Sequence, residues 1–269
     1  MRELDNANFI DTWNPETLPL DILDRLKNNQ EDLLGYFKRE EALSNGEVED
    51  EIDKILWRNE FSDQYYELVE HWLTPRLNSE SIRAWHYTRL LPAEIDAIRA
   101  AGIFVSDEMQ MLKRLNFAES QGYLTPEEVA KLSRESPLRY SDQQAGRLGK
   151  FWMTSQPEPI CDSGIKPLIQ HWGGEVIYFW QKDKALINRL QIIGSPAIVE
   201  LKVPVEYTKH AFSAAQSIVA NFIRNIRGKS TSDKFDVYSV VNLDSSFVLG
   251  LHHEGSPGYE QHSLGLVDI

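Results

Sequence analysis

Two residues in the stretch Ala84–Leu90, His86 and Thr88, have types and a spacing that suit ligand binding. Apolar and polar residues mix in this stretch as in a half-buried strand, and residues two apart in a strand share a face. An imidazole and a hydroxyl on one face offer a polar ligand both a donor and an acceptor. A histidine on a strand is also commonly a structural, hydrogen-bonded residue, so the pair needs support from a second stretch.

A helix is predicted directly after this strand. Pro92 suits its first turn, Glu94 lies near its positive end, and Gly102 is placed to end it. His86 and Thr88 therefore lie in a strand that is followed directly by a helix.

The second informative stretch, Phe151–Ser155, predicts a short aromatic strand that ends in a threonine and a serine. Prolines follow it, and a helix is predicted through Ile165 and Ile169 until Gly173 and Gly174 stop it. Two short strands, each followed by a helix, therefore carry the polar and aromatic candidates.

Composition is that of an ordinary soluble globular protein. Of 269 residues, 42% are hydrophobic and 26% charged, and no apolar run is long enough to span a bilayer. The polar start of the chain, residues 1–6, lacks the features of a signal peptide, so we expect a cytoplasmic protein. The single cysteine, Cys161, excludes an internal disulfide and a cysteine-rich metal site, and we interpret it as a bystander.

The negative charge is concentrated at the start of the chain. Residues 1–80 hold 20 acidic and 8 basic residues, a net charge of −12, out of −13 for the whole chain. This asymmetry predicts two domains, an acidic helical region over residues 1–80 and a second domain over residues 81–269.

Hydrophobic periodicity predicts the remaining elements. In the acidic region we expect three amphipathic helices, over residues 21–38, 47–57 and 61–73, with Pro75 ending the last. In the second domain we expect further helices over residues 106–116, 125–135, 183–190 and 212–226, strands over residues 175–180, 197–203, 235–241 and 247–252, a loop over residues 138–148 and a turn-rich tail. About six strands with interspersed helices predict an α+β fold.

Several familiar sites are absent from the sequence. It contains no glycine-rich phosphate loop, no His-Glu-x-x-His and no Gly-x-Ser-x-Gly. His252, His253, Glu254 and His262 include metal-binding types, but no regular spacing supports a metal site, and we predict none.

Taken in order, His86-Tyr87-Thr88 and Phe151-Trp152-Met153-Thr154-Ser155 resemble the first two motifs of the ADP-ribosyltransferase superfamily. The resemblance covers residues 81–269. It implies a split mixed β-sheet with helices, and NAD as a substrate.

The resemblance also implies roles for individual residues. His86 and Thr88 would hold the dinucleotide, and Phe151 or Trp152 would stack on the nicotinamide. The usual aromatic residue of that family is a tyrosine, so Trp152 departs from the pattern.

A later acid would complete such a site by stabilising the positive charge that develops on the ribose. Four carboxylates are candidates, and each also has a purely structural interpretation. Glu175, which opens a predicted strand after two glycines, ranks first. The others are Asp236, Glu254 and Glu200, the last interpreted as a solvated strand residue.

The resulting hypothesis is an NAD-dependent mono-ADP-ribosyltransferase that modifies RNA, DNA or a protein, as a bacterial toxin or phage-defence effector. A non-catalytic binding module with the same fold is one alternative. A phosphotransferase-like enzyme that acts on RNA ends through His86 and Arg89 is another.

Partners follow from the same hypothesis and from the charge. We expect a macromolecular acceptor, an antitoxin or regulatory protein as a further candidate partner, and no membrane. Solvation alone explains the acidic faces of the helical region; the alternative is that this region lies against a basic groove of the target or a partner's basic surface.

Overall fold

The computed structural model describes residues 9–228 and 233–266. The chain divides into two compact units. The first contains residues 1–82, 204–206 and 210–235, and the second contains residues 83–203, 207–209 and 236–269. Residues 210–235, which the sequence places in the second domain, therefore belong with the acidic helical unit. The polar start, residues 1–6, lies outside the described residues.

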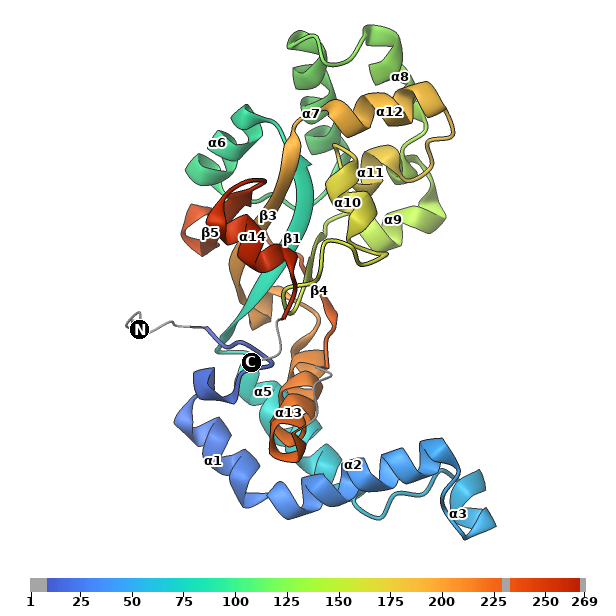
Figure 1. The fold of residues 1–269 in the computed structure, drawn as a ribbon, viewed down its shortest axis with the longest axis vertical. Coiled ribbons are helices and arrows are strands. Elements are labelled where there is room, and N and C mark those ends of the chain that lie inside the picture. The colour runs from blue at the N-terminus through green and yellow to red at the C-terminus, as the bar shows by residue number, and fades with distance from the viewer. Residues whose placement is uncertain (1–8, 229–232, 267–269) are drawn as a thin grey trace. The chain divides into compact units, whose positions relative to one another are not determined.

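The first unit is helical (Figure 1). A long helix from the distant C-terminal half of the chain, α13, packs against α2, the π-helix η2 and α5. The elements of the first unit are η1 (Pro15–Thr17), α1 (Leu20–Asn28), α2 (Gln30–Asn45), α3 (Glu51–Ile55), α4 (Ser62–Tyr66), η2 (Glu67–Leu73), α5 (Thr74–Leu77) and α13 (Ala211–Arg227).

Two helices in this unit differ from the prediction. The single helix expected over residues 21–38 is broken at Asn29, where α1 ends and α2 begins. Pro75 does not end the third helix, because the preceding seven residues widen into the π-helix η2. A π turn shifts the hydrogen-bond register, so the missing N–H of a proline is tolerated there.

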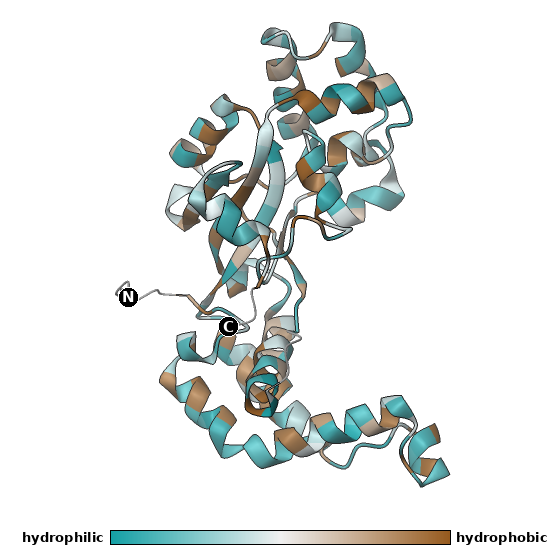
Figure 2. Ribbon diagram, viewed as in Figure 1, coloured by the Kyte–Doolittle hydropathy of each residue, from teal (hydrophilic) through white to brown (hydrophobic). Residues whose placement is uncertain are grey.

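The interior of the first unit is mostly apolar, with one buried amide. Figure 2 shows hydrophobic residues along α13, whose buried face includes Ile218, Val219 and Phe222. The buried Asn221 side chain donates to the carbonyls of Thr12 (3.2 Å) and Asp233 (2.9 Å), so its polar groups are satisfied within the unit.

The second unit is built on a five-stranded sheet with the order β4-β2-β1-β3-β5. Its strands are β1 (Ser81–Leu90), β2 (Phe151–Thr154), β3 (Ser195–Pro204), β4 (Asp236–Ser239) and β5 (Val248–His253). The sheet is antiparallel, whereas the resemblance implied a mixed sheet. The pairs β1 with β2, β2 with β4, and β3 with β5 are each antiparallel.

The faces of β1 follow from alternation and register. Trp85 lies opposite Thr154 of β2, so these two side chains share a face. His86 and Thr88 point to the opposite face. Trp85 and His86 therefore mark the two faces of the sheet.

Helices of the second unit gather beside β1 and β3 (Figure 1). Their shared core includes the fully buried Trp172 and Leu190. The helical elements are α6 (Pro92–Ala101), α7 (Glu108–Ser120), α8 (Pro126–Arg134), η3 (Pro137–Arg139), α9 (Ser141–Arg147), α10 (Lys166–Gln170), α11 (Glu175–Tyr178), α12 (Lys184–Ile192), η4 (Val205–Tyr207, at the border between the units), η5 (Ser245–Phe247) and α14 (Pro257–Ser263).

Three predictions for this unit are wrong. Residues 175–180 form the short helix α11 and not a strand, the predicted loop 138–148 contains η3 and α9, and the turn-rich tail contains α14. A run of five apolar residues, 176–180, fits a buried strand and a buried helix equally well. Here Gly174, with φ of 68°, turns the chain so that Ile177 packs against Gly173. The sheet consequently has five strands instead of about six.

No described helix combines the length and the hydrophobicity needed to cross a membrane. The α+β class predicted from the alternation of elements is confirmed.

Candidate functional site

His86 is fixed by the neighbouring strand. Its Nδ1 atom lies 2.8 Å from the main-chain carbonyl oxygen of Trp152, and its ring lies 4.3 Å from the ring of Phe151, centre to centre. The register between β1 and β2 consists of the single pair Trp85 and Thr154. The imidazole therefore contacts a main-chain carbonyl of β2 close to that pair.

This contact determines the protonation of the imidazole. A carbonyl only accepts hydrogen bonds, so Nδ1 of His86 carries the proton. Loss of solvent, together with the positive charge of Arg114, lowers the pKa of His86 to about 4, despite the opposing effect of the bond to Trp152. At pH 7 the ring is therefore neutral, and Nε2 is an acceptor. No group within residues 9–228 or 233–266 hydrogen-bonds to this Nε2.

The two aromatic candidates lie on different faces. Phe151 contacts His86, whereas Trp152 alternates to the other face and packs against Tyr238 with ring centres 4.6 Å apart. The indole N–H of Trp152 donates to the carbonyl of Gly146 (2.8 Å), and Lys150 lies over both the Trp152 and Tyr238 rings. Phe151 is thus the aromatic residue that the structure brings to His86.

Thr88 shares the face of His86 but is buried. Its hydroxyl makes one long contact, 3.4 Å, to the carbonyl of Arg89. A weakly engaged buried hydroxyl can turn toward a ligand at little cost.

Glu175, the first-ranked acid, begins α11 and is half-exposed. Its carboxylate lies 3.0 Å from the guanidinium of Arg147, which is partly buried and also lies over the ring of Phe179, 4.9 Å from its centre. Nε of Arg147 is buried without a hydrogen-bond partner among the described residues. The Glu175 carboxylate is therefore oriented by a cation that has donors to spare.

A second arginine links the Glu175 segment to His86. Arg114 donates to the carboxylate of Glu94 (2.6 Å) and to the carbonyl of Gly173 (3.5 Å), and its charge is felt at His86. Glu94 also accepts from the indole N–H of Trp172 (2.8 Å). This network ties the turn before Glu175 to helices α6 and α7.

Asp236, the other predicted catalytic acid, is placed differently. It pairs with Thr154 across β2 and β4, so its exposed carboxylate belongs to the Trp85 face. The structure does not bring it to His86.

Arg89, the cation of the RNA-end alternative, is engaged in holding the fold together. Its guanidinium donates to the carbonyls of Ile169 (3.3 Å), Ile193 (3.0 Å) and Gly194 (2.7 Å). These bonds tie the end of β1 to the start of β3 and leave little of Arg89 for a phosphate.

A second cluster of titratable groups lies on the Trp85 face. Glu200 of β3 is buried, with Oε2 2.9 Å from Nε2 of His252 and 3.3 Å from Nε2 of His262. Arg83 binds the other oxygen, Oε1, with Nε and Nη2 both at 2.7 Å. Burial opposes ionisation, but the bonds from both histidines and the charge of Arg83 hold the pKa of Glu200 well below its usual range.

Sequence reasoning interpreted Glu200 as solvated and grouped the histidines with Glu254. The structure leaves Glu254 exposed and outside the cluster. One signal was present: Glu200 is the only acid in the apolar run Ala197–Leu201. An acid inside a buried strand requires partners of opposite charge or hydrogen-bond donors.

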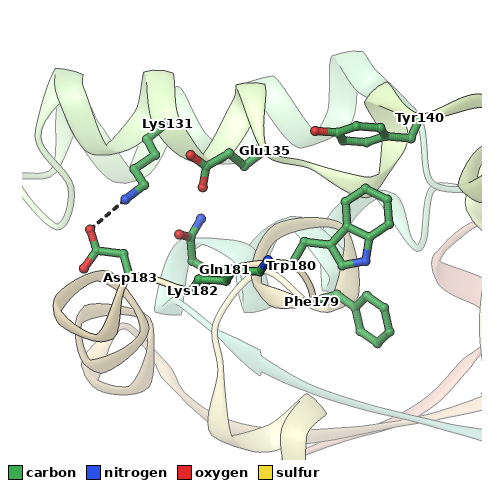
Figure 3. A pocket seen from close by; sticks show the side chains of 8 residues that line it. All are labelled: Lys131, Glu135, Tyr140, Phe179, Trp180, Gln181, Lys182 and Asp183. Atoms are coloured by element: carbon green, nitrogen blue, oxygen red, sulfur yellow. Dashed lines mark hydrogen bonds and ion pairs between the residues drawn. The ribbon is translucent and has the colours of Figure 1, made fainter.

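A pocket of about 620 Å³ is lined in part by the residues that follow α11 in the sequence, beginning with Phe179 (Figure 3). The side chains of Tyr140 and Trp180 form an aromatic edge, with ring centres 4.5 Å apart. Opposite them Lys131 pairs with Asp183 at 2.7 Å. Gln181 is 8% exposed, and neither atom of its amide has a hydrogen-bond partner within the described residues.

The fold and these groups define an α+β protein whose antiparallel sheet carries a neutral histidine on one face and a carboxylate–imidazole cluster on the other. No protein-family model, no curated protein and no solved structure matches the chain.

Proposed function

We propose that the face of the sheet around His86 binds NAD and transfers ADP-ribose to a macromolecular acceptor, a nucleic acid or a protein. The observation that carries this proposal is the state of His86: neutral, with Nδ1 held by the carbonyl of Trp152 and Phe151 beside the ring. Its Nε2 is an acceptor for a ribose hydroxyl, which is a donor.

Each neighbouring group has a task in this reaction. The ring of Phe151 offers its face to the cationic nicotinamide. The Thr88 hydroxyl lies two residues further along β1 on the same face, and it adds a polar contact to the dinucleotide. As the bond to nicotinamide breaks, positive charge grows on the ribose, and a nearby carboxylate stabilises it.

Glu175 is the carboxylate that we assign to this task. Gly174, where a Cβ atom would meet nothing within 4 Å, precedes it, so the main chain can approach a ligand closely there. Arg147 orients the Glu175 side chain. Arg114 contacts the same segment at the carbonyl of Gly173, and its charge acts on His86. Asp236, on the other face, is not part of the proposed site.

The biological setting that we propose is a toxin or phage-defence effector acting in the cytoplasm, where NAD is available. An antitoxin or regulatory protein would then be a partner.

The test uses the purified protein with NAD labelled on the adenylate, together with a whole-cell lysate. We expect nicotinamide release and label on an acceptor, and nuclease or protease sensitivity identifies the acceptor class. Replacing His86 with alanine or Glu175 with glutamine should each lower the rate by about 10²-fold or more.

His71→Ala is the matched control, because His71 is exposed and lies in the other unit. Its release rate should equal that of the wild type. Nicotinamide release without label on any acceptor would indicate a hydrolase. Absence of both release and NAD binding by the wild type would overturn the proposal in favour of a non-catalytic module.

A further inference from the structure

We propose that Glu200, His252 and His262 form a binding site for a first-row divalent cation, with Zn²⁺ as the best-suited ion. The site lies on the Trp85 face of the sheet, and it is independent of the function proposed for His86. One carboxylate oxygen and two imidazole nitrogens are a familiar set of three protein ligands for zinc.

The distances among the ligand atoms fit a metal. Oε2 of Glu200 lies 2.9 Å and 3.3 Å from the two Nε2 atoms, and all three ligand atoms lie within 4.8 Å of one another. Zinc bonds of about 2.0–2.1 Å at tetrahedral angles separate neighbouring ligand atoms by about 3.3 Å. An ion therefore enters with small rotations of the side chains.

The carboxylate is held in the orientation that a metal needs. Arg83 takes Oε1 with two nitrogens at 2.7 Å, which leaves Oε2 directed at the histidines. The guanidinium in turn lies over the ring of Trp85, 5.0 Å from its centre. Such outer contacts orient metal ligands and are expected to affect affinity strongly.

The ring of His252 lies between two glycines, Gly250 and Gly258. A Cβ atom on Gly250 would lie 2.5 Å from Nε2, and one on Gly258 would lie 2.1 Å from Nδ1. Both distances are far below contact, so only glycine at these positions admits the imidazole. Strand β5 and helix α14 thus both leave room for one histidine.

The chemistry of the ligands selects the kind of ion. Imidazole nitrogens favour zinc and its first-row neighbours, whereas Mg²⁺ and Ca²⁺ prefer oxygen ligands. Three protein ligands leave a fourth position open, and the His252 side chain is still 20% exposed. A solvent molecule or a ligand can reach the ion from that side.

A metal also explains why two imidazoles surround an acid that is already neutralised. Arg83 alone supplies the opposite charge for Glu200. The two histidines add ligand capacity beyond what the carboxylate requires. A closed hydrogen-bonded network without affinity for metal is the competing outcome of the test.

The experiment measures zinc on the full-length protein. Protein stripped with a chelator is dialysed against micromolar Zn²⁺, and bound metal is determined by mass spectrometry. We expect one zinc per chain, and a rise in melting temperature on adding Zn²⁺. Cobalt in place of zinc should give visible absorption bands that report the coordination number.

His252→Gln and His262→Gln should each lose most of the bound zinc and the thermal shift. His253→Gln is the matched control: the neighbouring residue on β5 is exposed and belongs to the opposite face, so zinc binding should be unchanged. Arg83→Gln should weaken binding by about 10–100-fold.

Melting temperatures of the stripped variants show whether each is folded. His252→Gln is the decisive variant, because His252 is the more exposed of the two histidines. Zinc bound equally by His252→Gln and the wild type, or no zinc bound by a folded wild type, would overturn the site. Either result leaves the His86 proposal untouched, because nicotinamide release is measured separately.

Discussion

A partly buried histidine and a buried carboxylate with charged partners respond to pH in different ways. The pKa of His86 is lowered to about 4 because burial disfavours the imidazolium ion. The pKa of Glu200 is held low because two imidazoles and Arg83 favour its ionised form over the cost of burial. At neutral pH the first group is thus a neutral acceptor and the second is a fixed anion.

The lowered pKa of His86 predicts a loss of stability in acid. The unfolded chain binds this proton near pH 6.5, whereas the folded protein binds it only near pH 4, so stability falls as pH falls through this window. Between pH 7 and pH 5 the contribution is about 2 kcal/mol. The free-energy cost of His86→Gln, measured by urea unfolding, should shrink by about that amount at pH 5. A cost independent of pH would contradict the shift.

Gln181 predicts a stabilising substitution. Its amide is buried and has no partner among the described residues, and a buried polar group without a partner costs about 1–3 kcal/mol. Gln181→Leu should raise the free energy of unfolding by about 1 kcal/mol. Gln191→Leu is the control, since Gln191 is exposed and bonds to His171, and it should show no gain. A destabilised Gln181→Leu would indicate that the amide has a solvent or ligand partner.

At the scale of elements, helix ends fix the position of the strands that bear the site. Helix α6 follows β1 and ends at Gly102, which has φ of 82° and ψ of −150°. That conformation is essentially restricted to glycine. Ile103 then exchanges main-chain hydrogen bonds with Leu243, 2.6 Å and 2.9 Å long, which ties the end of the helix to the segment after β4.

Gly102→Ala should therefore be far more costly than an alanine at another helix end. A Cβ atom at Gly102 would lie 2.1 Å from the carbonyl oxygen of Leu243, whereas at Gly122, with φ of 74°, it would meet nothing within 4 Å. We expect a loss of about 3 kcal/mol or more for Gly102→Ala and about 1 kcal/mol for Gly122→Ala. Chemical denaturation measures both, and equal losses would contradict the close approach.

Elements with local signals were predictable from the sequence, and elements set by tertiary contacts were not. The helices expected over residues 125–135 and 212–226 are found as α8 and α13, because the capping box at Thr125 and the αL glycine at Gly228 are local signals that mark their ends. Helix α11 was missed, because its apolar residues match a strand until Gly173 and Ile177 are seen to pack.

The candidate sites divide in the same way. Alternation along β1 places His86 and Thr88 together, and the contact of Phe151 with His86 needs the pairing of β1 with β2. The cluster of Glu200 with His252 and His262 joins residues more than 50 positions apart. No spacing along the chain encodes it, so only the sheet order reveals it.

At the scale of the whole molecule, the acidic unit is made from two distant parts of the chain. Helix α13 buries Ile218, Val219 and Phe222 against elements of the N-terminal part. Some acids of this unit are paired internally, as Glu41 is with Arg227 at 2.5 Å. Others carry no described ion pair and face solvent, and they hold the charge available to a basic partner. Among these exposed acids are Glu31, Asp32, Glu49, Glu67 and Glu70.

Charge and packing in this unit are separable by two variants. Deleting residues 1–77 removes the acids but also uncovers the apolar face of α13, so we expect aggregation in size-exclusion chromatography. Neutralising the five acids named above to glutamine or asparagine changes the net charge from −13 to −8 and leaves the core intact. That variant should elute and melt like the wild type, and any partner that binds through charge should lose affinity and salt dependence together. A monodisperse deletion variant that keeps α13 helical would show instead that α13 folds without the N-terminal part.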